Sequence, residues 1–205
     1  VTFTNNTADR YGGAINMNGI NGSIKDSTFK DNKAHAGGAL LWDQGINNIL
    51  ENTTFESNTA EIYGGAIYGI KSTNATIRNV TFDNNKVNGD PALIIVDNGD
   101  GGAIAWDTAD DLNIDEVIFT NNMANSDGAA IYIYEGNDVK FNRLTVNDNT
   151  GKDSGAITLV NLDDFGINET EFVNNKATDG YGGALNLAGS NGVVYNATFD
   201  GNTAL

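Results

Sequence analysis

Residues 55–67 read FESNTAEIYGGAI: an aromatic residue, an Asn three positions later, and then a Gly-Gly-Ala-Ile block. The aromatic–Asn pair recurs along the whole chain, at Phe3/Asn6, Phe29/Asn32, Phe55/Asn58, Phe82/Asn85, Phe119/Asn122, Val146/Asn149, Phe172/Asn175 and Phe199/Asn202. Successive aromatic positions lie 26, 26, 27, 37, 27, 26 and 27 residues apart. A period this regular predicts one structural unit stacked on copies of itself.

Each unit offers three short apolar segments with a period of two. One contains the aromatic position, and one contains the Gly-Gly-Ala-Ile block. The third has an apolar residue five positions before the aromatic one, at Ile24, Leu50, Ile77, Ile114, Phe141, Ile167 and Val194. No stretch sustains a helical period. The sequence therefore predicts an all-β parallel β-helix, or β-solenoid, of about seven coils of 26–27 residues. Each coil has three short strands, and neighbouring coils lie about 4.8 Å apart.

The recurrent Asn is predicted to form a structural ladder at a turn. Its amide would bond to the next coil and to local backbone, as amides do in stacked strands. Asn also tolerates the left-handed backbone that tight corners need. The predicted ladder comprises Asn6, Asn32, Asn58, Asn85, Asn122, Asn149, Asn175 and Asn202.

Composition narrows the class of protein. The 205 residues include 32 Asn, 25 Gly, one Pro and no Cys, so thiolate metal sites and disulfides are excluded. The net charge of −16 argues against nucleic acid and anionic membranes as partners. No apolar run approaches the roughly 18 residues of a transmembrane helix. We expect one β-helix domain over 1–205, cut from a longer protein, because the chain begins and ends inside a repeat.

The 37-residue step marks an insertion of about ten residues near 87–100. It contains Pro91 and the apolar run 92–96. A binding loop and a locally packed flap are both open interpretations. The segment 97–101, DNGDG, weakly resembles a Ca²⁺ loop but lacks the full spacing and the terminal Glu.

A second row carries Asp111, Asp138 and Asp164 where other coils have Asn. Carboxylates about 5 Å apart repel by roughly 3–4 kcal/mol at an effective dielectric near 20. A Ca²⁺ ion would relieve that repulsion, so these three residues are candidate metal ligands. The alternative is a solvated turn at which Asp replaces Asn.

The residue after each Gly-Gly-Ala-Ile block is expected to point outward. These residues are Asn16, Leu41, Tyr68, Ala105, Tyr132, Thr158 and Asn186. Tyr68 and Tyr132, with Tyr134 nearby, are therefore candidates for binding sugars or another protein, since tyrosine is both apolar and hydrogen-bonding. The alternative is ordinary tyrosines on a β-surface.

No sequence pattern indicates catalysis. Nucleophile elbows, Walker loops and dinucleotide fingerprints are missing. Arg78 and Arg143 fall on one edge beside several acids, an arrangement that suits either a polysaccharide lyase or surface ion pairs. We expect no enzymatic activity and assign no catalytic residue.

The paired motifs, Phe-x-x-Asn and Gly-Gly-Ala-Ile, resemble the repeats of polymorphic outer-membrane (autotransporter) proteins and of methanogen adhesin-like surface proteins. The resemblance covers the whole chain and implies a secreted, right-handed parallel β-helix on the cell surface. The same fold class contains pectate-lyase-like enzymes.

These observations favour a non-catalytic, adhesin-like extracellular module. Its expected partners are glycans or proteins on host or neighbouring cells, or other copies of itself, and no cofactor other than Ca²⁺ is anticipated. One alternative is a structural subunit of a surface sheath or filament that assembles end to end. The other is a polysaccharide-active enzyme.

Overall fold

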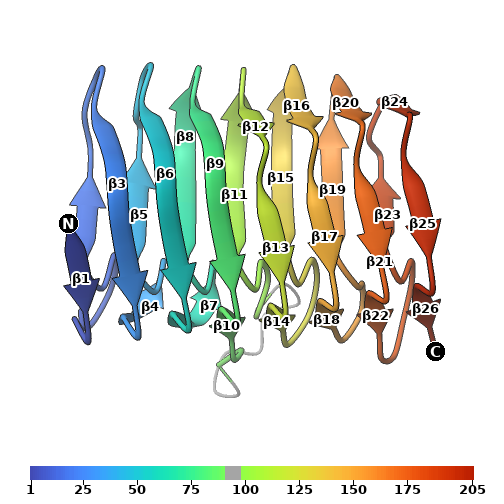
Figure 1. Ribbon diagram of the computed structural model, residues 1–205, viewed down its shortest axis with the longest axis horizontal. Coiled ribbons are helices and arrows are strands. Elements are labelled where there is room, and N and C mark those ends of the chain that lie inside the picture. The colour runs from blue at the N-terminus through green and yellow to red at the C-terminus, as the bar shows by residue number, and fades with distance from the viewer. Residues whose placement is uncertain (91–97) are drawn as a thin grey trace.

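The computed structural model describes residues 1–90 and 98–205, and every regular element in those ranges is a β-strand. Strands of successive coils pair in parallel to form three sheets along an elongated solenoid of about seven turns (Figure 1). The chain advances coil by coil from β1 at one end of the solenoid to β26 at the other. The predicted parallel β-helix is therefore confirmed.

Sheet A contains the aromatic positions. In the register, Phe29 pairs with Phe55, and Phe55 with Phe82, so equivalent positions lie directly over one another. Its strands are β1 (Thr2–Thr4), β3 (Ser23–Lys30), β6 (Ile49–Glu56), β9 (Thr76–Asp83), β12 (Asn113–Asp115), β13 (Ile118–Thr120), β16 (Val139–Asn142), β17 (Thr145–Asn147), β20 (Phe165–Asn168), β21 (Glu171–Val173), β24 (Gly192–Tyr195) and β25 (Thr198–Asp200).

Sheets B and C complete each coil. Sheet B follows the recurrent Asn, with strands β4 (Lys33–Ala36), β7 (Thr59–Tyr63), β10 (Lys86–Val87), β14 (Met123–Ala124), β18 (Thr150–Gly151), β22 (Lys176–Ala177) and β26 (Thr203–Ala204). Sheet C begins at the Gly-Gly-Ala-Ile blocks, with strands β2 (Ile15–Met17), β5 (Leu40–Asp43), β8 (Ile67–Thr73), β11 (Ile104–Asp110), β15 (Ile131–Asn137), β19 (Ile157–Leu162) and β23 (Leu185–Ala188).

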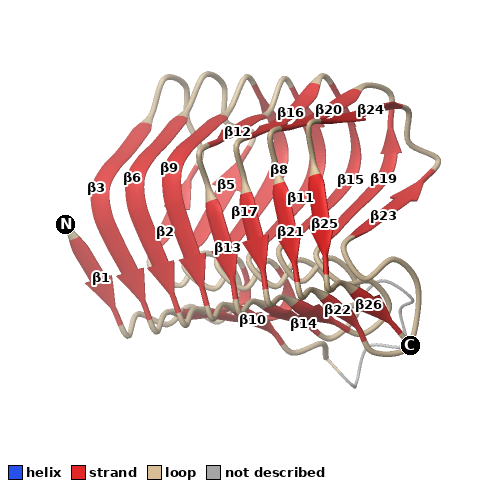
Figure 2. Ribbon diagram, turned by 45° about the vertical axis from the view of Figure 1, so that its right-hand side comes forward, coloured by secondary structure: helices blue, strands red, loops and turns tan. Residues whose placement is uncertain are grey.

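The three predicted segments are distributed over the sheets differently from expectation. The apolar row at Ile24 and the aromatic row share sheet A, on single strands in β3, β6 and β9 and on paired strands such as β12 and β13 in later coils (Figure 2). The third sheet is instead sheet B, whose short strands bury small residues, including Ala60, Val87 and Ala124. Such short segments carry too little apolar periodicity to be recognised from sequence.

Stacked phenylalanines form one column of the core. Neighbouring ring centroids from Phe3 to Phe119 lie 4.7–5.0 Å apart, with interplanar angles of 12° or less. Parallel pairing imposes this spacing, because it matches the distance between adjacent strands. Val146 interrupts the column and is itself fully buried.

A second core contact joins two tryptophans that are two coils apart. Trp42 and Trp106 flank Gly69 in sheet C, and their ring centroids lie 5.5 Å apart. A Cβ atom on Gly69 would lie 2.2 Å from Cδ2 of Trp106. Both indole nitrogens are buried without a hydrogen-bond partner in residues 1–90 and 98–205. Packing alone therefore holds the pair, and it requires a residue without a side chain between the rings.

The eight recurrent asparagines form a continuous ladder of amides, and the six inner ones are buried. At Asn58, Oδ1 accepts hydrogen bonds from the backbone N–H and from Nδ2 of Asn32, at 3.0 and 2.9 Å. Its own Nδ2 donates to the carbonyl oxygen of Phe29 and to Oδ1 of Asn85. Each amide thus satisfies buried backbone as well as its neighbours.

The inserted segment lies between β10 and β11 in the chain, and residues 91–97, with Pro91 and the whole apolar run 92–96, lie outside the described residues. Its base is closed by Asn98, whose Oδ1 accepts from the Asp90 backbone N–H and whose Nδ2 donates to the Asp90 carbonyl oxygen. Val87, at the edge of the predicted insertion, belongs to β10. None of the described residues forms a helix suited to crossing a membrane.

Candidate binding site

The outer face of sheet C carries an aromatic pocket across β8, β11 and β15. Register places Tyr68, Ala105 and Tyr132 in one row across these strands. Asp107 and Tyr134 are paired in the row two residues further along. The three tyrosines expected to bind a ligand therefore line one pocket, of about 240 Å³.

The opening of the pocket depends on a small residue between two large ones. Tyr68 and Tyr132 belong to strands on either side of β11, two strand spacings or about 9–10 Å apart. Ala105 occupies the place between them and is itself buried. Its methyl group leaves the space between the two tyrosines unfilled, which produces a recess rather than a flat β-surface.

Tyr63 and Asp107 complete the pocket and were missed by sequence reasoning. Tyr63 ends β7, and its ring stacks on that of Tyr68 at 5.3 Å between centroids. The chain turns from sheet B to sheet C after Tyr63, and the left-handed conformation of Gly64, where φ is +60°, is part of this corner. Burial, and then the negative charge of Asp107, raises the pKa of the Tyr68 hydroxyl, so this ring stays neutral at physiological pH.

The outward row is less exposed than the strand alternation suggested. Leu41, Ala105 and Thr158 are buried, and Tyr132 is only 9 % exposed, whereas Tyr134 is 39 % exposed. Neighbouring side chains account for part of this cover: Tyr68 and Tyr132 flank Ala105, and the Ser154 hydroxyl bonds to that of Thr158. The register of sheet C retains the predicted row, and the exposure of its members differs from one coil to the next.

Asp111, Asp138 and Asp164 do not form a metal-binding cluster. Residues 1–90 and 98–205 contain no group of three or more His, Cys, Asp or Glu suited to holding a metal. Lys140 supplies the cation instead: its Nζ lies 2.7 Å from Oδ1 of Asp138, and this contact lowers the pKa of Asp138. Asp97 of the suggested Ca²⁺ loop lies outside the described residues, and Asn98 binds the Asp90 backbone.

Backbone geometry explains why Asn or Asp occupies five positions of that row. Asn21, Asn47, Asn74, Asp111 and Asp138 all have φ between 52° and 56°. Residues with short polar side chains adopt this left-handed conformation at lower cost than other non-glycine residues. The two aspartates therefore have a corner role that the asparagines share.

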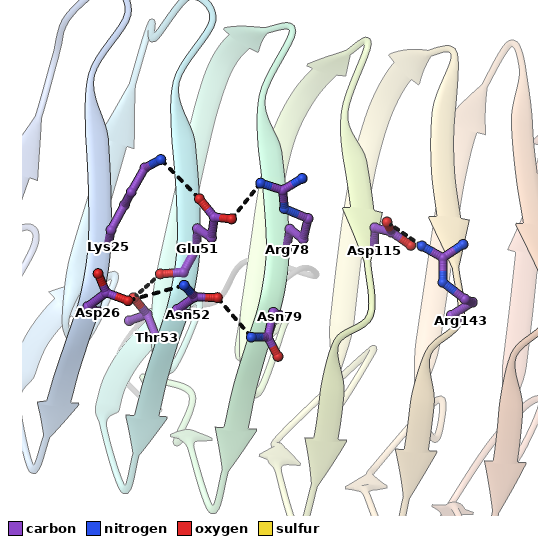
Figure 3. A network of polar contacts seen from close by, with 9 residues as sticks. All are labelled: Lys25, Asp26, Glu51, Asn52, Thr53, Arg78, Asn79, Asp115 and Arg143. Carbon is purple, nitrogen blue, oxygen red and sulfur yellow. Dashed lines mark hydrogen bonds and ion pairs between the residues drawn. The ribbon is translucent and has the colours of Figure 1, made fainter.

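Arg78 and Arg143 lie in ion pairs on the outer face of sheet A (Figure 3). Glu51 bridges Lys25 and Arg78, at 3.0 and 2.5 Å. Arg143 contacts Asp115 at 2.6 Å. An amide ladder along Asp26, Asn52 and Asn79 runs beside this network. Figure 3 shows these groups bonded from one coil to the next, so the contacts link neighbouring coils.

The Glu51 network predicts acid-sensitive stability. Hydrogen bonds from Lys25 and then Arg78 hold the pKa of Glu51 below its ordinary value of 4.5. A lowered pKa in the folded state means that the contribution to stability is complete above pH 4.5 and is lost as the pH falls through the lowered value. Thermal melts should show Glu51→Gln less stable than the wild type at pH 7, with the difference vanishing in acid. A pH-independent difference would contradict this mechanism.

The geometry defines a parallel β-helix with an aromatic pocket on one outer sheet. Residues 13–204 match the family described as the right handed beta helix region, so the chain belongs to the right-handed β-helix family. Residues 1–17 match the Chlamydia polymorphic membrane protein repeat. This match confirms the resemblance to polymorphic outer-membrane repeats over the first 17 residues, whereas the resemblance over the whole chain and that to methanogen adhesin-like proteins stay predictions. No curated protein and no solved structure matches the chain.

Proposed function

We propose that this chain is a non-catalytic, adhesin-like module of a cell surface, displayed outside the cell, and that it binds its partner through the tyrosine pocket of sheet C. The match of its first residues to a polymorphic membrane protein repeat supports an association with a membrane or surface. The observation that carries the proposal is the convergence of four tyrosines, from β7, β8 and β15, on one recess.

The architecture suits this role. The backbone hydrogen bonds and amide ladder of the solenoid hold the pocket residues on paired strands, so little conformational entropy is lost on binding. Tyrosine offers contact area together with a polar group, which favours glycans and protein surfaces as partners. Arg78 and Arg143 form ion pairs on sheet A, and this favours a role in linking neighbouring coils over a role in polysaccharide cleavage.

The proposal predicts that the pocket controls adhesion. Binding of the fluorescently labelled chain to whole cells and to a panel of immobilised glycans should fall at least about ten-fold in Tyr68→Ala and Tyr134→Ala, the scale expected when an aromatic contact residue is truncated. Tyr181→Ala is the matched control, because Tyr181 is 76 % exposed and lies outside the pocket.

Two results would count against the proposal. Equal binding by the pocket variants and the wild type would place adhesion elsewhere on the surface. Cleavage of an acidic polysaccharide by the purified chain, abolished in Arg78→Ala or Arg143→Ala, would show an enzyme instead.

A further inference from the structure

We propose that the tyrosine pocket binds a compact alkylated ammonium group, such as the trimethylammonium group of choline. This inference rests on the proposed function, because it names the chemistry of the ligand at the same pocket. Three features carry it: the arrangement of the rings, the charge of the lining and the size of the recess.

The register places two tyrosines on either side of one recess, as an aromatic cage requires. Tyr68 and Tyr132 stand on either side of the space above Ala105, with about 9–10 Å between their strands. A group over Ala105 would lie about one strand spacing from the strand of each tyrosine, a separation that allows both rings to come within the roughly 6 Å over which a cation is attracted to an aromatic face. Tyr63 and Tyr134 add two further rings to the lining.

The charge of the lining favours a cation. Among the described residues that line the pocket, Asp107 is the single acidic one and none is basic. Its Oδ1 accepts a hydrogen bond from the Thr108 hydroxyl, and no Lys or Arg in residues 1–90 and 98–205 forms an ion pair with it. The whole chain carries a net charge of −16, so its field attracts cations and repels anions.

The size of the recess favours a single small group. Pockets for drug-sized ligands usually measure about 300–1,000 Å³, whereas this one measures about 240 Å³. An oligosaccharide would have to lie mostly outside it. A trimethylammonium group is compact and weakly hydrated, and so it gains from rings on several sides without losing many hydrogen bonds to water.

The test compares two ligands of the same shape and different charge. Choline and its neutral isostere, 3,3-dimethyl-1-butanol, are titrated into the 205-residue chain by isothermal titration calorimetry at fixed ionic strength. We expect choline to bind at least about ten-fold more tightly, because only the charged ligand gains a cation–π attraction. Phosphocholine is the third ligand in the titration. If it binds as tightly as choline, the natural ligand is a phosphate-bearing head group; if it binds more weakly, the natural ligand is a methylated amine without phosphate.

Single substitutions test separately the contributions of the Tyr68 ring, the Tyr68 hydroxyl and the Asp107 carboxylate to choline binding. Tyr68→Leu should weaken choline binding about ten-fold, whereas Tyr68→Phe should stay within about three-fold because the aromatic face remains. Asp107→Asn should weaken choline binding and leave that of the neutral isostere unchanged. Tyr134→Leu provides a more exposed ring variant, and Tyr181→Leu is the control outside the pocket. Circular dichroism melts check that each variant is folded.

The outcomes separate this inference from the function on which it rests. Equal affinity for the two isosteres, or no heat from choline in the millimolar range, would overturn the ammonium assignment. If Tyr68→Ala and Tyr134→Ala still lost cell binding in that case, the adhesive function would stand. Choline binding that depends on Tyr68, combined with cell adhesion unaffected by pocket variants, would uphold the ligand assignment and overturn the adhesive role.

Discussion

Replacing Asn58 by Ala should lower the free energy of unfolding by roughly 3 kcal/mol or more. Four groups would lose a partner: the Asn32 backbone N–H, the Asn32 amide, the Phe29 carbonyl oxygen and Oδ1 of Asn85. Leaving a buried polar group unsatisfied costs about 1–3 kcal/mol. Asn58 is fully buried, so water cannot easily take the place of its amide. Urea denaturation monitored by circular dichroism measures the effect.

Asn18→Ala is the matched control for this experiment. Asn18 also bonds through its amide to the next coil, donating to Oδ2 of Asp43 at 3.1 Å, but this contact is exposed. We expect its removal to change stability by no more than about 0.5 kcal/mol. A loss at Asn58 as small as that at Asn18 would mean that the buried ladder does not hold the coils together.

Replacing Gly69 by Ala should destabilise the fold by about 1–3 kcal/mol, the usual range for overpacking a core. The new Cβ would meet the indole of Trp106 at 2.2 Å, and that indole is buried and already packed toward Trp42. Neither ring can move aside without disturbing the stacked coils. The midpoint of thermal or urea unfolding reports the loss.

A double-mutant cycle tests the cause. Trp106→Leu removes the opposing ring without breaking a hydrogen bond, since the indole nitrogen has no partner in residues 1–90 and 98–205. In that background Gly69→Ala should cost less, giving a coupling energy of at least about 0.5 kcal/mol. Gly166→Ala controls for the backbone change, because a Cβ there would meet nothing within 4 Å. Additive effects in the cycle would exclude the steric explanation.

Much of the fold was predictable because the sequence period fixes the register of the strands: residues one repeat apart lie in paired positions of neighbouring coils. A residue that recurs every 26 or 27 positions can stack on its copies only if each coil closes after one repeat. Phe29, Phe55 and Phe82 therefore had to share a column, and the ladder of Asn32 and Asn58 followed from the same spacing. The 37-residue step did not disturb this register, since β11 and β13, which follow it, pair in register with β8 and β9, which precede it.

The candidate site was only partly predictable. Alternation placed Tyr68 and Tyr132 on one outward row, which the structure retains. It could not show that Tyr63 folds back over Tyr68, because that contact depends on the left-handed turn at Gly64. The row of aspartates led to a wrong prediction. Three stacked carboxylates suggested a set of metal ligands, whereas Asp138 forms an ion pair with Lys140.

The sequence by itself determined the stacked coils, the aromatic column and the amide ladder, since each depends on a repeated residue meeting its own copy one strand spacing away. Only the tertiary structure decided how unlike members of one row pack and which rows meet at a corner: the tryptophan rings beside Gly69, the ion pairs of sheet A, the recess above Ala105 and the stacking of Tyr63 on Tyr68. Those contacts depend on the rotamer that each side chain adopts and on the turn at Gly64, and a linear period carries no information about either.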